Sequence, residues 1–593
     1  MNDKSRNPTD PAHIAEELHD AFDFDHQDPM VGLSHHDLSG MRLTRRSTLR
    51  LLAASGMLSA YHLIPGTGAV RPAAAASGGT LRAGWAGVGE IITLDPAQIN
   101  QVLQFQIMSN VISGLTHINA DLIAEPDVAE SWEVSADGKE YTFKLRKGVT
   151  FHNGDAFTAD DVLFTYNRSK DPQQSIHGRV LKNVVDAMKL DDHTVKFVLG
   201  APQASFLVKT TERASGRALS LVSRGALKSM GASQYGLTPV GTGPFRVTEH
   251  KLGQGVVLEK NPDYFDPGRP KLDKVIIKPI DGAEPIAGAI EAGDVQFVGG
   301  NPIPAQLIDR FASNPDLVIN EKPGPGFQSV WLNPWHEAMK VTDFNKPLAA
   351  LKKDKGFMVR LAIAKGLDRE RFVKQARFGR GVPAYGSINP AMGYYYDKSL
   401  SETSEQAFDL DAARKLMADA GYPGGKGFPE LELICTPGTK RDAEVVANIF
   451  KTNLGIKVNV VPKEFSVGIV DFNTNNYDMR LGGSGGDYDP DDGLVDWMQT
   501  ASKFNGPKRD KVKHPFGYFS EAEADALIVK QSATADPAMR KALVRQANKI
   551  NSDKVTCAFL YHPVDVQVRH KSVNFPDESR IPGLADLDRV TVS

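Results

Sequence analysis

The chemically richest segment of the chain spans Asn476–Asp492 and has the sequence NYDMRLGGSGGDYDPDD. Its glycines place Ser484 in the pattern G-x-S-x-G, which marks the nucleophile turn of α/β-hydrolases. That turn requires a helix to begin directly after the serine, because the helix N-terminus helps to stabilise an oxyanion. The residues Asp487–Pro490 follow instead, and they start no such helix. A secreted serine hydrolase that uses Ser484 is therefore kept only as the enzyme alternative.

The same segment contains three alternating aspartates, Asp487, Asp489 and Asp491, in the manner of the first ligands of a calcium-binding loop. An EF-hand loop requires glycine at its sixth position and glutamate at its twelfth. Those positions hold Asp492 and Met498 here. The pattern therefore argues against calcium, and we expect Asp491 and Asp492 to lie in a solvent-exposed turn.

The rest of the chain after residue 76 offers few reactive groups. It has no Cys/His cluster with zinc spacing and no phosphate-binding P-loop. His152 and His193 fall in predicted turns, where a structural or solvent-facing role is expected. The two cysteines, Cys435 and Cys557, are expected to be free, buried thiols. We therefore expect no metal, no cofactor and no catalytic residues.

The N-terminal region has the pattern of an export signal. Thr44–Leu49 reads TRRSTL and resembles a twin-arginine signal with Arg45 and Arg46 as its arginines. The apolar stretch Leu49–Ile64 that follows is too short to span a bilayer, which takes about 20 apolar residues. A run of small residues ends at Ala76, which predicts that the signal peptide is cleaved after this residue. The alternative interpretation is an apolar helix that follows a basic loop.

The composition limits the compartment and the partners. No cysteine lies near residue 76 to carry a lipid anchor, so we expect a soluble protein of the Gram-negative periplasm. The first 76 residues hold 7 of the 69 basic and 9 of the 72 acidic residues, which leaves 62 and 63 for the remainder. This near-neutral remainder lacks the excess of Lys and Arg that nucleic-acid binding requires. Its length allows two or three domains.

Local patterns predict the elements that position these residues. Ser131–Val134 and Glu140–Leu145 are strand-like, and Asp137-Gly138 between them favours a tight hairpin turn. Thr158 is a predicted N-cap for a helix through Val162-Leu163-Phe164. Further strands are predicted at Thr194–Leu199, Lys274–Pro279, Val295–Val298, Gln328–Leu332, Leu431–Cys435, Ile456–Val461, Cys557–Tyr561 and Val564–Val568. Further helices are predicted at Val102–Leu115, Lys355–Arg377, Leu410–Ala420, Ala443–Asn453 and Ala522–Ile550.

Three segments carry a family resemblance. Glu125–Arg168 (EPDVAESWEVSADGKEYTFKLRKGVTFHNGDAFTADDVLFTYNR), Pro239–Val247 (PVGTGPFRV) and the region around Leu367–Val373 resemble signature blocks of the bacterial extracellular solute-binding proteins of family 5. That family delivers peptides, opines or nickel complexes to ABC importers. The resemblance extends from Gly79 to about Val568. It implies a two-lobe α/β periplasmic binding protein fold of type II-like topology, with a cleft between the lobes and an extra subdomain in the first lobe.

The resemblance also implies a domain organisation. Residues 1–76 form a polar extension and the signal peptide. Residues 77–322 together with 557–593 form the first lobe, with the extra subdomain around 125–240, and residues 323–556 form the second lobe. The segment Lys322–Gly326, KPGPG, is the predicted crossing, because alternating proline and glycine interrupts regular structure.

The family's ligand loop corresponds to the glycine- and aspartate-rich segment. In peptide-binding relatives, an aspartate at the position of Asp487 accepts the ammonium group of the ligand through a charge-assisted hydrogen bond. Some relatives have an arginine six residues earlier, where this chain has Leu481, and Arg480 is expected to point away from the pocket. Ser484 replaces an aromatic residue of the relatives, and Gly482–Gly486 form a wall of small residues.

The expected function is solute capture by hinge closure without catalysis. The solute is expected to be a di- or oligopeptide or a related amine-bearing compound, and the expected partners are the ABC permease subunits and the twin-arginine export machinery. We expect a monomer; a chaperone or sensory receptor on the same fold is the remaining alternative. Aromatic residues at such positions belong to the hydrophobic core as often as they contact a ligand. The candidate ligand contacts are Asp487, Tyr488, Ser484, Gly483, Trp331, Asn333, Tyr385, Ser387, Trp497, Gln98, Asn100 and Gln101.

Overall fold

The computed structural model describes most of the chain after residue 77. The described ranges are 78–86, 91–99, 102–119, 123–212, 218–280, 282–300, 305–341, 343–485, 488–500, 502, 504–505, 517–534, 536–575 and 586–593. The predicted signal with Arg45 and Arg46 lies outside these ranges. Within them, no helix is both long and apolar enough to cross a membrane.

A seven-stranded sheet, called the first sheet here, joins both ends of the described chain. Its order is β12-β19-β11-β1-β10-β9-β8, with β1 parallel to β10 and β11 and the remaining pairs antiparallel. The predicted strand at residue 274 is confirmed, and the one predicted from residue 295 begins two residues later. The strands of the first sheet are β1 (Thr80–Ala86), β8 (Phe245–Lys251), β9 (Gly255–Lys260), β10 (Lys274–Ile280), β11 (Phe297–Gly300), β12 (Leu317–Pro323) and β19 (Val564–His570).

A six-stranded sheet, called the second sheet, has the order β14-β18-β13-β17-β15-β16. β15 is parallel to both β16 and β17, and α14 (Lys440–Leu454) connects β15 to β16. This confirms the parallel pair that the strand–helix–strand pattern predicts. The strands are β13 (Gly326–Leu332), β14 (Val382–Pro383), β15 (Leu431–Cys435), β16 (Val458–Pro462), β17 (Met479–Gly485) and β18 (Ala558–His562).

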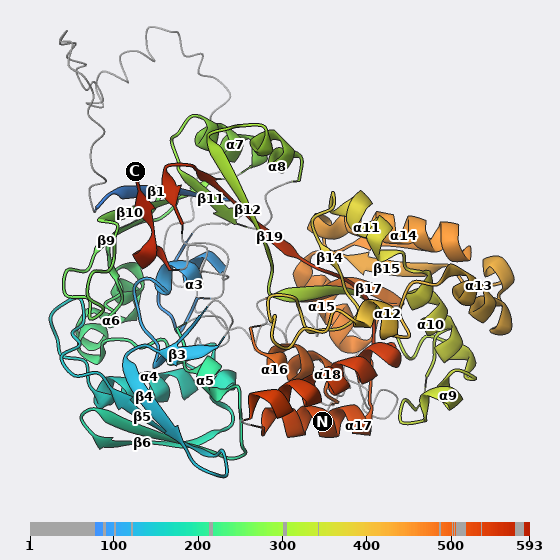
Figure 1. The fold of residues 1–593 in the computed structure, drawn as a ribbon, viewed down its shortest axis with the longest axis horizontal. Helices are drawn as coiled ribbons and strands as arrows, with labels where there is room; N and C mark the ends of the chain where they lie inside the picture. The colour runs from blue at the N-terminus through green and yellow to red at the C-terminus, as the bar shows by residue number, and fades with distance from the viewer. Residues whose placement is uncertain are drawn as a thin grey trace, which may run out of the picture. The chain divides into compact units, whose positions relative to one another are not determined.

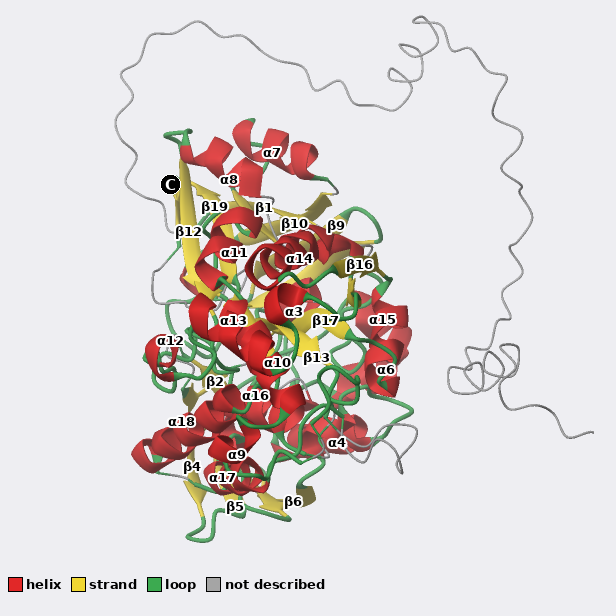
Figure 2. Cartoon of the chain, turned by 90° about the vertical axis from the view of Figure 1, so that its right-hand side faces the viewer, coloured by secondary structure: helices red, strands yellow, loops and turns green. Residues whose placement is uncertain are grey.

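Helices surround the second sheet, and α10, α13 and α14 group beside it in both views (Figures 1 and 2). The region predicted as helical from residue 522 is divided, because Asp536 caps a new helix that Pro537 begins. Asp368 similarly separates α10 from α11. The helices are α9 (Leu348–Leu351), α10 (Lys355–Gly366), α11 (Arg369–Ala376), α12 (Leu400–Thr403), α13 (Leu410–Asp419), α15 (Phe465–Thr474), α16 (Pro490–Gly493), a π-helical turn (Leu494–Met498), α17 (Ala522–Ser532) and α18 (Pro537–Asp553).

The chain changes sheet at two short proline-containing segments. β12 ends at Pro323 in the first sheet, and β13 begins at Gly326 in the second. On the return, β18 pairs with β13 and β14, and only β19 rejoins the first sheet. Residues 558–562 therefore lie in the second sheet, whereas the sequence places them with the first lobe. The return passes through Pro563.

The predicted extra subdomain region has its own antiparallel sheet, β4-β5-β7-β6, and its own apolar core. The predicted hairpin and helix cap are confirmed: Gly138 has a φ of 70°, and Thr158 forms a capping box with Asp161. The main elements are β4 (Ala129–Val134), β5 (Glu140–Leu145), α4 (Ala159–Lys170), β6 (Val184–Asp191), β7 (Thr194–Leu199), α5 (Phe206–Lys209) and α6 (Arg224–Leu237).

One predicted helix is shorter than expected. α3 spans Val102–Met108, so the prediction of helix to Leu115 is wrong by seven residues. Tight main-chain turns follow Met108, and Gly114 packs against the backbone of Thr210 and Glu212, where a longer helix could not fit. Remaining elements are β2 (Thr116–Ile118), β3 (Ala124–Pro126), 3₁₀ turns (Gly178–Leu181, Pro423–Gly425, Pro437–Thr439, Leu587–Arg589), α7 (Ala283–Glu291), α8 (Ala305–Ala312), β20 (Val573–Asn574) and β21 (Thr591–Val592).

The two cysteines are free and buried, as the sequence predicts. Burial raises the pKa of the Cys435 thiol to about 11 and that of Cys557 to about 12. Both thiols are therefore protonated at neutral pH, and their role is packing in the core of the second sheet.

Candidate functional site

The glycine-rich segment forms the second half of β17. The main-chain oxygen of Phe327 on β13 lies 1.8 Å from the position that a Cβ at Gly483 would occupy, so only glycine allows the two strands to pair there. Ser484 lies within the strand, opposite Phe327, and the next helix begins at Pro490. This is not the strand-to-helix turn of a serine nucleophile. The glycines serve close strand packing.

Two aspartates shape the loop after β17. Asp489 is the N-cap of α16 and accepts a hydrogen bond from the Asp491 N–H at 2.9 Å. The Oδ2 atom of Asp492 accepts hydrogen bonds from the main-chain N–H groups of Tyr488 and Asp489, both at 3.1 Å. These contacts complete a capping box and fix the direction in which the chain leaves the loop.

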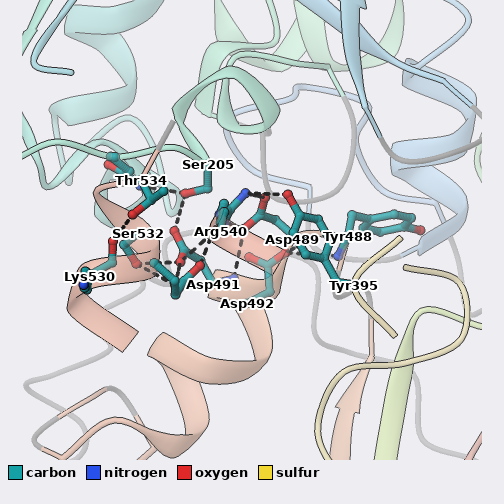
Figure 3. A network of polar contacts seen from close by, with 12 residues as sticks. Ser205, Tyr395, Tyr488, Asp489, Asp491, Asp492, Lys530, Ser532, Thr534 and Arg540 are labelled. Atoms are coloured by element: carbon teal, nitrogen blue, oxygen red, sulfur yellow. Dashed lines mark hydrogen bonds and ion pairs between the residues drawn. The ribbon is translucent and has the colours of Figure 1, made fainter. Parts of the chain in front are cut away.

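A buried ion pair anchors this loop to α18. The Arg540 guanidinium donates to both carboxylate oxygens of Asp489, at 2.9 and 2.5 Å, and both side chains are about 5% exposed (Figure 3). It also donates to the Tyr395 hydroxyl at 3.3 Å. Burial alone would lower the pKa of Arg540, but the adjacent Asp489 charge raises it above its ordinary value. Arg540 is therefore held charged.

Asp491 is buried in a polar network, which corrects the expectation of a solvent-exposed turn. Its carboxylate is 4% exposed and accepts hydrogen bonds from Gln531 Nε2 at 2.5 Å and Ser532 Oγ at 2.7 Å (Figure 3). Ser205 Oγ donates to it at 2.5 Å from the start of α5. Burial favours the protonated acid, but Arg540 and these hydroxyls lower the pKa of Asp491 overall.

Asp492 also departs from the predicted exposed turn. Its side chain is half-buried in the loop that it caps, and burial raises its pKa to about 7. The neighbouring charges of Asp489 and Asp496 act in the same direction. At neutral pH the Asp492 carboxyl group is therefore present in both its protonated and its charged form, unlike that of its neighbour Asp491.

Contacts from the α5 segment connect this loop to a distant part of the chain. Besides the Ser205 bond, the Ala204 N–H donates to the Ser532 carbonyl at 2.6 Å. The Tyr488 side chain packs against Ile118 and Val208, which belong to the same region. The loop after β17, α16 and the end of α17 are thus each contacted by residues from a much earlier part of the sequence.

Several predicted ligand contacts lie in the core of the second sheet. Trp331 is fully buried, stacks with Trp497 at a ring distance of 5.3 Å, and donates to the Gly482 carbonyl at 2.8 Å. Asn333 donates to the Tyr477 carbonyl at 2.7 Å. These residues are brought together, and their contacts are those of a packed interior. We therefore leave them out of the ligand set proposed below.

The remaining predicted contacts are dispersed. Ser387 is buried against Asn548, and the guanidinium of Arg369 covers the ring of Tyr385 at 4.5 Å. Gln98 is exposed and donates to the Gln174 carbonyl at 2.7 Å. The structure does not bring these three together with Trp331. Asp487, Asn100 and Gln101 lie outside the described residues.

The sequence gives no indication of the partners that hold the loop. Ser205, Gln531, Ser532 and Arg540 are isolated polar residues in ordinary helical or turn contexts. Only the helix cap had a local signal, which the sequence analysis did not use: Asp489-Pro490 followed by Asp492 is the pattern of an N-cap, a first-turn proline and a capping box.

A cavity of about 300 Å³ lies beside β2 and β3. Its charged lining residues pair with one another, as in Arg269 with Asp588 at 3.4 Å and His117 with Glu212 at 3.5 Å. None of the predicted ligand contacts lines it. Among the described residues, no group of three or more His, Cys, Asp or Glu side chains could hold a metal ion.

Comparisons with known proteins agree on one family. Residues 124–506 match the model described as "Bacterial extracellular solute-binding proteins, family 5 Middle". The chain is 28% identical over 505 residues to Di/tripeptide-binding protein 1 of Pseudomonas aeruginosa, covering 81% of this chain and 88% of the relative. It is 29% identical over 334 residues to the glutathione-binding protein GsiB of Escherichia coli K12, covering 56% and 60%.

The fold matches a solved structure as well. The ABC transporter-associated periplasmic binding protein DppA from Helicobacter pylori, in complex with the peptide STSA, superimposes with a TM-score of 0.67. Sequence identity is 23%, and the match covers 87% of this chain and 98% of DppA. The two-lobe α/β fold that the sequence predicts is confirmed by this likeness.

Proposed function

Because the chain belongs to family 5 of the bacterial extracellular solute-binding proteins, we propose that it is the solute-binding subunit of an ABC importer. The observation that carries this proposal is the family match across residues 124–506, extended by likeness to a di/tripeptide-binding protein over most of both chains. The position of Ser484 within a strand supports a binding role over hydrolysis. The protein captures its solute and releases it unchanged.

The solute is a short peptide or a related compound with a free amine. Two of the relatives bind di- and tripeptides or glutathione, which are small amine-bearing peptides. Asp487 follows β17 directly and is the receptor for the ammonium group. The anchored loop supports this role: β17 fixes the chain before Asp487, and the Asp489–Arg540 pair fixes it afterwards. A receptor carboxylate on a fixed backbone loses little entropy when the ligand binds.

Capture follows from movement of the lobes about the two crossings. The segments at Pro323–Gly326 and Pro563 are the hinge, since in the described part of the chain these short connections join strands of the first sheet to strands of the second. The bonds from Ser205 to Asp491 and from Ala204 to Ser532 then belong to the closed form. A solute that contacts both lobes favours closure by its differential affinity for that form. The permease recognises the closed form.

The sequence supports export before function. The twin-arginine motif at Arg45-Arg46 and the small residues before Ser77 are those of a cleaved signal, and no nearby cysteine could take a lipid. The proposed location is therefore the periplasm, beside a permease in the inner membrane. Replacing Arg45-Arg46 with Lys-Lys should retain the precursor in the cytoplasm, which cell fractionation measures.

Calorimetric titration of the mature protein with a dipeptide panel tests the proposed function. Asp487→Ala should weaken binding by about 30-fold or more, because removing one partner of a desolvated charge pair costs about 2–5 kcal/mol. Asp478→Asn is the matched control, since Asp478 directly precedes the first residue of β17 and caps nothing in the loop that follows the strand. Unchanged affinity in Asp487→Ala would remove the amine-recognition role, and absence of any peptide binding would remove the peptide class.

A further inference from the structure

The α5 segment, residues 204–209, is packed in one apolar core and contacts elements of another. Phe206 is 1% exposed and belongs to the core of the subdomain, where its ring lies 5.6 Å from that of Phe197. α17 and α18 pack in the core of the second sheet through Ile528 and Val544. Among the described residues, the two cores have no member in common. Contacts between the α5 segment and these helices therefore join two separately packed bodies.

The Ser205 hydroxyl makes the first of these contacts. Ser205 is the N-cap of α5, a position at which serine commonly accepts a hydrogen bond from its own helix, but its side chain makes no such bond. It donates instead to Asp491 Oδ2 on the other body, at 2.5 Å (Figure 3). Ser205 is fully buried and Asp491 is 4% exposed. The bond is therefore a desolvated contact between a hydroxyl and a carboxylate across the boundary of the two bodies.

A main-chain hydrogen bond lies beside this side-chain bond. The Ala204 N–H donates to the Ser532 carbonyl at 2.6 Å. Ser532 is the last residue of α17, where carbonyl groups have no partner within the helix. Its hydroxyl donates to Asp491 Oδ1 at 2.7 Å, so Ser532 takes part in both contacts. The end of α17 and the Asp491 carboxylate together form one surface that receives the α5 segment.

Charge and apolar packing favour the same contact. Burial acts to raise the pKa of both Asp491 and Asp492, and the Lys209 charge, at the end of α5, acts to lower it. The ammonium group therefore lies close enough to attract both carboxylates. On the other side of the contact, the Tyr488 side chain packs against Val208 of the same segment. Hydrogen bonds, an opposite charge and an apolar contact thus coincide at one place.

Asp491 remains hydrogen-bonded within its own body when Ser205 is removed. Gln531 Nε2 donates to it at 2.5 Å, and Arg540 Nη2 lies 3.8 Å away. When the two bodies separate, water takes the place of the Ser205 hydroxyl, and one hydrogen bond is exchanged for another. Separation therefore costs far less than disruption of either apolar core, so the contact forms and breaks while both bodies stay folded.

We propose that the α5 segment and the end of α17 with Asp491 form a latch that closes the lobes without contacting the solute. The inference rests on the proposed function, because closure is the step that captures the solute there. Ser205 and Asp491 are buried and bonded to one another, so a solute does not reach them. The latch gives the solute-free protein a populated closed form, and it raises the affinity for every solute by one common factor.

Spin-label distance measurements on the solute-free mature protein test the latch. Labels are attached at Val185→Cys on β6 and Met539→Cys on α18, which are 62% and 56% exposed, while the native cysteines are buried and stay unlabelled. Wild type should show a short distance beside a long one. Ser205→Ala should lower the ratio of short to long about tenfold, because it removes a hydrogen bond to a charged group. A wild type without the short distance, or an unchanged distribution in Ser205→Ala, would overturn the inference.

Ser223→Ala is the matched control. Ser223 is 1% exposed and caps α6 by accepting a hydrogen bond from the Ala226 N–H at 3.1 Å, so its bond does not cross between the bodies. Its loss should lower the melting temperature and leave the spin-label distances unchanged. Ser205→Ala should do the reverse, because Asp491 keeps its other partners. Equal distance changes in the two variants, or a larger fall in melting temperature in Ser205→Ala, would assign Ser205 to folding and overturn the inference.

Calorimetry separates the latch from solute recognition. L-Ala-L-Ala, L-Ala-L-Lys and glutathione are titrated into wild type, Ser205→Ala and Asp487→Ala. Ser205→Ala should weaken binding of each ligand by one common factor of up to about tenfold, since only the closed fraction changes. No loss, or a loss confined to one ligand, would overturn the inference. Asp487→Ala tests amine recognition separately: if no peptide binds, the proposed peptide class fails, and the spin-label distances alone decide whether the latch exists.

Discussion

The buried pair between Asp489 and Arg540 makes a quantitative prediction about the loop that follows β17. In Asp489→Asn, the amide oxygen keeps the cap contact to the Asp491 N–H, but Arg540 loses its nearest counter-charge and retains only the Asp491 carboxylate, 3.8 Å away. Removing one partner of a buried pair typically costs about 3–5 kcal/mol, since an uncompensated charge remains inside. Arg540 is 5% exposed but keeps Asp491 at 3.8 Å, so we expect a cost near the lower end of that range.

A double-mutant cycle measures this effect. Urea unfolding, followed by circular dichroism, is compared for wild type, Asp489→Asn, Arg540→Met and the double variant. The two losses should be less than additive, because each single change already breaks the Asp489–Arg540 pair, while Asp491 lies beside Arg540 in both backgrounds that keep the arginine. Lys415→Met, which removes an exposed pair with Asp419, is the control and should leave stability unchanged. Additive losses, or a loss below about 1 kcal/mol in Asp489→Asn, would refute the reasoning.

Three further predictions concern single groups. Burial raises the pKa of Asp492 to about 7. The folded state therefore favours the protonated Asp492, and this stabilisation is complete below pH 4 and is lost as the pH rises through 7. Asp492→Asn should therefore match wild type in urea unfolding at pH 4 and exceed it at pH 8, by up to about 4 kcal/mol; a constant difference would contradict this. Gly483→Ala should lower unfolding stability by about 1–3 kcal/mol through its clash with β13, whereas Gly485→Ala, with open space around it, should not. Cys557 should react with a thiol reagent only in denaturant, and rapid labelling of the native protein would contradict its burial.

The elements that the sequence predicts well are those whose causes are local. The hairpin around Gly138 requires a positive φ that glycine supplies, and the helix after Thr158 has its cap and its Asp161 within four residues. The β15–α14–β16 unit has clear changes of hydrophobic period at its boundaries. Each of these signals lies inside a short window of sequence, so tertiary packing does not have to be known.

The errors arise where partners are far apart in the chain. Asp491 looks like a solvated turn residue because no basic residue lies within ten positions of it, yet Ser205 hydrogen-bonds to it across 286 residues. The early end of α3 depends on Gly114 packing against the Thr210 backbone, another long-range contact. Such contacts follow from the folded arrangement of the lobes, and no local pattern encodes them.

The polar groups around β17 divide into two kinds, and the division bears directly on function. Asp489, Asp491 and Arg540 form hydrogen bonds with one another and with neighbouring helices. They therefore hold the loop in place and have few free hydrogen-bonding positions for a solute. Arg480 has no such partner among the described residues. Polar groups left unsatisfied inside a fold cost stability, so the two kinds of group contribute differently to the fold.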